Sequence, residues 1–233
     1  MFKKIVMLFA VCLMVTTTVF ANGVSQLTTV QVTGSSQKEI APDIAKISLS
    51  INTTHAKLDQ AKNENTQLSN QVFAKLSEQG ILDDQIKTES YRIDSLYSYE
   101  NDRLPKLIGY KVINSIEITT SIEKVGLLVN ELTNAGANEI SSIRFEKENE
   151  KDVKNAALNA AVQDALQKAE VIAGALGKHV SAVKVVNESG NFYNPVMVNS
   201  RAYKSASMDE GAPPIAVGKI TVGATVQVTV ELE

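Results

Sequence analysis

The stretch ENEKDVKNAALNAAVQDALQKAEVIAGAL, residues 148–176, carries the longest helical pattern in the chain. Alanine recurs every four residues along it, at Ala157, Ala161, Ala165, Ala169 and Ala173, and Leu158, Val162 and Leu166 form an adjacent row. Alanine has the highest helix propensity, and its small side chain lets a helix backbone come close to a neighbour. We therefore predict a helix, ended by Gly177, whose alanine seam packs on a sheet or on another helix. A helix that joins copies of the chain is the alternative.

Strands and shorter helices surround this segment. The clearest strand runs over 219–231, where Ile220, Val222, Ala224, Val226, Val228 and Val230 face one way and polar residues face the other. Similar alternation predicts strands over 28–33, 43–54, 86–99, 107–119, 139–147 and 180–186. Apolar residues at helical spacing predict helices over 56–79 and 122–135, ended by Gly80 and Gly136. The order predicts an α+β fold: two β-α-β-type units, then the long Ala-rich helix and C-terminal strands, forming mainly antiparallel sheet. Whether the two units are an internal repeat stays open.

Between the last two predicted strands runs a segment rich in Asn, Ser, Gly and Pro, over 187–218. A loop of this length inside a compact domain is either functional or without fixed structure. It contains Phe192, Tyr193, Met197 and Tyr203, more apolar and aromatic side chains than a solvated linker needs. We predict that these four residues contact a protein partner.

The first 21 residues predict export. Lys3 and Lys4 precede an apolar run over 5–20, and Val19-Phe20-Ala21 fits a cleavage site for a signal peptide. The mature chain, 22–233, is then one domain located in the periplasm, or secreted to another part of the cell envelope, with no transmembrane span left after cleavage. Cys12 is the only cysteine and would leave with the signal, so the mature chain forms neither disulfides nor thiolate sites.

Composition and motifs also argue against several classes of activity. The formal net charge is -3, and no basic cluster suggests a nucleic-acid partner. His55 and His179 are the only histidines, and neither lies near a carboxylate at metal-ligand spacing. Phosphate-binding loops and a G-x-S-x-G elbow are lacking. We therefore predict a protein that is not an enzyme, with no catalytic residue, cofactor or metal.

The alternative is a small-molecule-binding protein or an unrecognised hydrolase. It would use a pocket lined by Tyr91, Tyr97, Tyr99 and Tyr110, which fall on the two strands of the predicted hairpin. The competing interpretation of these tyrosines is cross-strand packing within that hairpin.

Several short motifs together resemble the SIMPL domain family. They are Val30–Gly34, Ala41–Ile47, Gly80-Ile81 with Ile86–Thr88, Ile108-Gly109-Tyr110, Gly136-Ala137 with Ile143–Phe145, the end of the Ala-rich helix at 168–177, and the closing strand at 220–232. The resemblance implies an α+β fold and a cell-envelope location. Bacterial members include periplasmic and outer-membrane-associated immunogenic proteins and YggE-like oxidative-stress proteins.

The family resemblance implies no catalytic residues that could be transferred to this chain. Together with the predicted signal peptide, it leads to one functional hypothesis. The chain is an exported, non-enzymatic envelope protein that acts by protein-protein interaction or by self-assembly into a homo-oligomer. An indirect link to oxidative-stress defence is part of that hypothesis.

Overall fold

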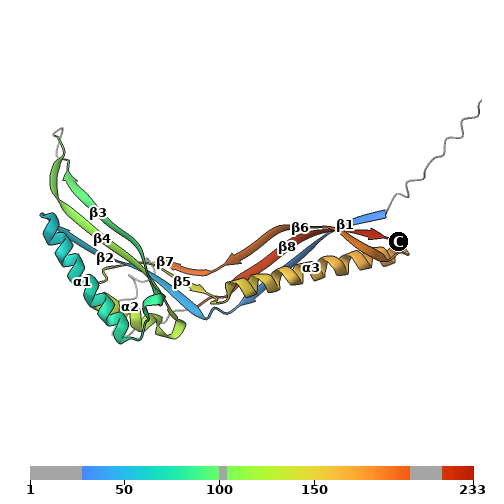
Figure 1. The fold of residues 1–233 in the computed structure, drawn as a ribbon, viewed down its shortest axis with the longest axis horizontal. Helices are drawn as coiled ribbons and strands as arrows, with labels where there is room; N and C mark the ends of the chain where they lie inside the picture. Colours follow the sequence, from blue (N-terminus) through green and yellow to red (C-terminus); the bar gives the residue numbers. More distant parts are fainter. Residues whose placement is uncertain (1–27, 100–103, 200–216) are drawn as a thin grey trace, which may run out of the picture.

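The structure, a computed structural model, describes residues 28–99, 104–199 and 217–233. Their order is β1 (Thr28–Ile40), β2 (Ile44–His55), α1 (Leu58–Glu78), β3 (Ile86–Ser98), β4 (Lys106–Ser121), α2 (Val125–Asn134), β5 (Glu139–Glu146), α3 (Glu150–Ala175), β6 (Val180–Asn194), β7 (Val196–Asn199) and β8 (Ile220–Leu232). Short 3-10 turns, Asp83–Gln85 and Ile122–Lys124, precede β3 and α2. The predicted α+β fold with antiparallel sheets is confirmed, and the two sheets lie end to end along a bent molecule (Figure 1).

The larger sheet has the strand order β3-β4-β2-β5-β7 and is built from two interlocked units. In the unit β2-α1-β3, strand β4 lies between the two strands of the unit. In the unit β4-α2-β5, strand β2 takes that place. Each helix therefore crosses over one intervening strand, which is the split β-α-β arrangement of ferredoxin-like folds. The two predicted units are present, but neither pairs its own strands directly.

Helices α1 and α2 cover one face of this sheet and close its core. The fully buried side chains come from β2, β4 and β5 and from both helices: Ile47, Leu49, Ile51, Ile116, Ile118, Ile143, Phe145, Val72, Leu76, Leu128 and Leu132. Asn65 occupies one position of the apolar stripe of α1, and its Nδ2 donates to the carbonyl oxygen of Ile51 at 2.8 Å. A buried polar side chain is tolerated there because it has a hydrogen-bond partner.

The smaller sheet has the order β1-β8-β6 and is covered on one face by α3. The alanine seam faces this sheet, and its members are buried against the valines of β8. The approach is closest at Gly34 in β1, where an added Cβ would lie 2.0 Å from the carbonyl oxygen of Ala161. The prediction that the seam packs on a sheet is confirmed, and the seam is used within the chain rather than between copies.

The predicted loop over 187–218 is wrong for its first part. Strand β6 continues to Asn194, and β7 follows at once as Val196–Asn199. Three irregularities in the pairing of β6 with β8, the last between Glu188 and Gly190, interrupt the alternation of side chains. Because a bulge shifts the two-residue period, the pattern no longer indicates a strand even though β8 supplies its hydrogen-bond partners. Residues 200–216 lie outside the described residues.

The predicted signal peptide, residues 1–21, also lies outside the described residues. No helix within the described ranges combines the length and the apolar character needed to cross a membrane.

Candidate functional site

The segment from β6 to β7 forms an outer edge of both sheets. Among the residues that the structure describes, β6 is the last strand of the smaller sheet, and β7 pairs with β5 alone at the end of the larger one. Figure 1 shows β6 passing directly into β7 where the two sheets meet. We call residues 180–199 the β6–β7 edge. An edge strand has one row of backbone N–H and C=O groups without a strand partner, so it is a natural place for another chain to bind.

Large apolar side chains are exposed along the β6–β7 edge. Between 37% and 56% of the surface of each of Val183, Val185, Val186, Phe192 and Met197 is accessible to solvent. Three of them, Val183, Val185 and Val186, belong to the strand predicted over 180–186. Val183 and Val186 stay exposed because α3 lies mainly over β1 and β8 and leaves much of β6 uncovered. Val185 lies opposite Thr229, on the face of the sheet away from α3. Exposed apolar side chains gathered on one edge are typical of an interaction surface.

The four predicted contact residues divide between the edge and the interior. Met197 lies on β7 opposite Arg144 and is exposed. Phe192 lies opposite Gly223 of β8, where an added Cβ would come within 2.4 Å of the phenyl ring, so the ring covers the glycine. Tyr193 faces α3 and packs against that core. Tyr203 lies outside the described residues. Of the four, Phe192 and Met197 are partly exposed on the edge, whereas Tyr193 packs against the interior.

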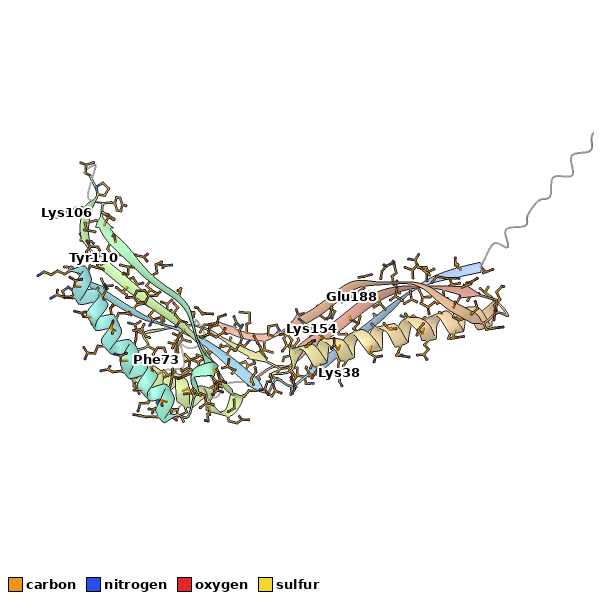
Figure 2. All side chains as sticks on the ribbon, viewed as in Figure 1. Lys38, Phe73, Lys106, Tyr110, Lys154 and Glu188 are labelled. Atoms are coloured by element: carbon orange, nitrogen blue, oxygen red, sulfur yellow. The ribbon has the colours of Figure 1, made fainter. Side chains whose placement is uncertain are left out.

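Tyr193 holds the point where the two sheets join. Its hydroxyl oxygen accepts a hydrogen bond from the backbone N–H of Lys147 at 2.6 Å. The ammonium group of Lys154 lies 5.6 Å from the centre of its ring, a cation-π distance. Figure 2 shows Lys154 at the start of α3, beside the junction. Partial burial raises the pKa of Tyr193, and the nearby carboxylates of Glu146 and Glu150 act in the same direction. The hydroxyl therefore stays neutral at physiological pH.

Asp43 completes the junction from the opposite side. Its Oδ2 accepts from Lys147 Nζ at 2.6 Å, and its Oδ1 accepts from the backbone N–H of Glu148 at 2.8 Å. Partial burial acts to raise the pKa of Asp43, but these two hydrogen bonds and the charge of Lys147 outweigh it and hold the pKa below its ordinary value. The carboxylate thus ties the chain just before β2 to the chain just before α3.

The lowered pKa of Asp43 predicts a loss of stability in acid. A carboxylate whose pKa is lower in the folded state stabilises fully above its unfolded-state pKa, and this contribution disappears as the pH falls through the folded-state pKa. The free energy of unfolding of the wild type should fall as the pH falls from about 5 to about 2, and in Asp43→Asn this fall should be smaller by about 1 kcal/mol. This value already allows for solvent screening, because the Asp43 side chain is 42% exposed. Urea denaturation over that pH series measures it.

Glu39→Gln is the matched control for the Asp43 experiment, because Glu39 forms an exposed ion pair with Lys219 at 3.3 Å. Exposed pairs contribute little to stability. Equal acid dependence in Asp43→Asn and wild type would show that Asp43 does not hold the junction.

The sequence matches the SIMPL family, whose description is "Protein of unknown function (DUF541)", over residues 30–230. The chain belongs to the SIMPL family. The matched range starts in β1 and ends in β8, so it includes both sheets and all three α-helices.

Two kinds of SIMPL relative are similar to this chain. The "26 kDa periplasmic immunogenic protein" of Brucella melitensis is 25% identical over 220 residues, which cover 90% of this chain and 88% of the relative. Its counterpart in Brucella abortus matches to the same extent. The "Uncharacterized protein YggE" of Escherichia coli K12 is 24% identical over 163 residues, 70% of this chain and 66% of the relative. These names state a periplasmic location for the Brucella proteins, and none of them states an activity.

The tyrosines of the alternative site do not face one another across the hairpin of this SIMPL chain. Tyr91 lies opposite Asn114 and Tyr97 opposite Leu107, whereas Tyr110 lies opposite Ser95 on one side and His55 on the other. The interpretation of these tyrosines as cross-strand packing residues stays a prediction, and Tyr97 has an apolar cross-strand neighbour in Leu107. Tyr91, Tyr97 and Tyr99 are about half or more exposed. An open groove of about 570 Å³ lies elsewhere, between β1 and α3, so it gives the tyrosine-lined pocket no support.

The two histidines lie apart and near strand ends. His55 ends β2, and its Nδ1 accepts from the backbone N–H of Lys57 at 3.4 Å. His179 precedes β6, with its Nε2 3.2 Å from Glu233 Oε1. Among the described residues, no serine and carboxylate join either histidine in a catalytic arrangement. Across the parts of the chain that the structure describes, no three His, Cys, Asp or Glu side chains gather at a spacing that suits a metal ion.

Sequence reasoning missed most of the β6–β7 edge. The sequence predicts a strand over 180–186 but not the exposure of its side chains, and only the tertiary structure shows that Val183, Val185 and Val186 are exposed. The useful signal was Gly223, because a glycine within a strand marks a place where another group lies close to the backbone. Phe192 is that group.

Proposed function

We propose that this SIMPL chain is an exported, non-enzymatic protein of the cell envelope that binds protein partners or further copies of itself through the β6–β7 edge. The observation that carries the proposal is that one continuous segment borders both sheets and exposes large apolar side chains at 183–186, 192 and 197. The periplasmic location stated for the Brucella relatives and the signal-like sequence of residues 1–21 support the envelope location.

The chemistry of the edge favours contact over catalysis. Its large exposed apolar side chains are valine, phenylalanine and methionine, which have no group able to transfer a proton or attack a substrate. Of its exposed charged residues, Lys184 is held in an ion pair with Glu231, and Glu188 is the other. What the edge offers is apolar area and strand hydrogen bonds, the two components of β-strand addition between proteins. The junction formed by Asp43, Lys147 and Tyr193 holds the two halves of the edge in a fixed relation.

The link to oxidative-stress defence that we propose is indirect. Residues 22–233 contain no cysteine, so reversible thiol oxidation is not available to the mature chain. A protective effect would therefore depend on what the β6–β7 edge binds.

Lysine substitutions on the edge test the proposal. In mature protein with Val186→Lys and Met197→Lys, self-association or partner binding should weaken by about tenfold or more, because a charge on an edge strand opposes pairing. Light scattering across a concentration series measures self-association. A photo-crosslinking residue at position 186 in intact cells reports contact with other proteins.

Leu82→Lys is the matched control, since Leu82 is an exposed leucine in the turn before β3, away from the edge. It should behave as wild type in both measurements. A chain that stays monomeric at every concentration and forms no crosslink from position 186 would refute the proposed function.

A further inference from the structure

The smaller sheet has a second edge at β1, and part of it is closed by side chains of α3. Within the described part of the chain, β1 pairs with β8 on one side and with no strand on the other. On its outer side, Lys168 Nζ donates to the carbonyl oxygen of Thr33 at 3.0 Å, and the backbone N–H of Ser35 donates to Asp164 Oδ2 at 2.8 Å. Asp164 and Lys168 also form an ion pair, with 2.7 Å between Oδ2 and Nζ. Their side chains thus bind the backbone groups of Thr33 and Ser35 that another strand would otherwise pair with.

These two contacts show which backbone groups of β1 point outward. In a strand, the N–H and C=O of one residue point to the same side, and the direction alternates from residue to residue. The pairing with β8 is continuous along β1, without a bulge. Since Thr33 and Ser35 point away from β8, the backbone groups of Thr29 and Gln31 do so as well. Towards the start of β1, the edge is therefore free of the Asp164–Lys168 pair.

A groove lies beside this open part of the edge. It encloses about 570 Å³ between β1 and α3, and its lining includes Gln31 and Thr33 from the strand and Gln167, Val171 and Ile172 from the helix. A volume of this size is within the range of ligand sites. Val171 is 67% exposed and Ile172 is 38% exposed, which is unusual for apolar residues of a helix packed on a sheet.

The groove selects its occupant by hydrogen bonding, charge and length. Unpaired strand groups match an extended polypeptide, which can continue the sheet. The lining is uncharged apart from Asp164 and Lys168, which neutralise one another, so it suits an uncharged segment. The open part of β1 runs from Thr28 to Val32, and a partner strand there spans about 17 Å before it meets the Lys168 contact. A second copy of the whole 13-residue strand could not pair along its full length.

We propose that the groove between β1 and α3 binds a short, uncharged, extended peptide segment of another protein. The segment adds to β1 as a strand of about five residues and places apolar side chains against Val171 and Ile172. This site lies on the opposite edge of the sheet from β6 and does not depend on the function proposed for the β6–β7 edge.

A proline substitution tests the hydrogen bonding without disturbing the sheet. The probe is a phage-displayed library of random hexapeptides selected on mature protein, from which the most enriched peptides are synthesised with a fluorescent label. Gln31→Pro removes an outward N–H and no bond to β8, so fluorescence anisotropy should show at least about tenfold weaker binding. Gln37→Pro is the matched control: it changes the same residue type at another outward position of β1, beyond the Asp164–Lys168 pair, and should bind as wild type.

Two further measurements make the result decisive. Bound peptide should slow hydrogen exchange at the amides of Gln31 and Thr33, and Ile172→Asp should weaken binding even if Gln31→Pro fails to fold. The proposal is overturned if no peptide with alternating apolar residues is enriched. It is also overturned if the enriched peptides bind both the Gln31→Pro and Ile172→Asp variants as well as wild type. Concentration-dependent dimerisation that Gln31→Pro abolishes in the absence of peptide would identify a second copy as the occupant instead.

Discussion

Replacing Gly34 with valine is expected to lower the free energy of unfolding by about 3 kcal/mol, the upper end for overpacking a core. A Cβ at Gly34 would lie 2.0 Å from the carbonyl oxygen of Ala161 and 2.6 Å from the backbone nitrogen of Ala165. Both contacts are with the backbone of α3, which cannot rotate out of the way as a long side chain can. The helix would have to move off β1 and would open the packing of the alanine seam.

Gly190→Val is the matched control for this substitution. Gly190 lies in β6 of the same sheet, has no atom within 4 Å of an added Cβ, and has no positive φ angle. Because valine favours strands, the control should keep or slightly increase stability. Urea denaturation followed by circular dichroism compares the two variants with wild type. If Gly34→Val were as stable as Gly190→Val, the close approach of α3 to β1 would be wrong.

Phe145→Ala is expected to lower the free energy of unfolding by about 4 kcal/mol. Phe145 is fully buried in the core of the larger sheet and is its largest buried side chain. It lies on β5 opposite Ala45 of β2, whose small side chain leaves room for the ring. Truncation would remove the contacts of the ring and leave a cavity, because the neighbouring strands are held in register by backbone hydrogen bonds.

Phe73→Ala is the matched control, because it makes the same substitution at a partly exposed position. Phe73 lies on α1 and is 36% exposed, so its truncation should reduce the free energy of unfolding by about 1 kcal/mol. Chemical denaturation of both variants under the same conditions gives the difference directly. Similar losses in the two variants would mean that Phe145 does not fill the core as described.

The helices could be predicted from the sequence because their signals are local. The alanine seam of α3 has a four-residue period, and Gly80 and Gly136 end α1 and α2 with φ angles of 73° and 120°. A positive φ is unfavourable for residues with a Cβ, so a glycine after an apolar helical run is a reliable end signal. Strand β8 was equally clear, since one of its faces is core and alternation is complete.

The candidate site was harder to predict because it depends on contacts between distant residues. The sequence predicts a loop at the end of β6, because the bulges of this strand disturb the alternation of side chains from which a strand is predicted. Of the residues predicted to contact a partner, Tyr193 turns inward because it lies opposite Val222, on the face that α3 covers. Which side of a strand is covered cannot be read from the strand alone.

The sequence by itself determined the helices, most of the strands and the α+β class, because these follow from the period of side chains along short stretches. It also determined the absence of cysteine from residues 22–233, which follows from composition. Only the tertiary structure decided the interlocking of the two β-α-β units, the assignment of β6 and β7 to the edges of two sheets, and the groove beside β1. Strand order and exposure arise from how α3 and β8 pack against residues far away in the chain. A helix laid over β1 and β8 buries one set of valines and leaves another exposed.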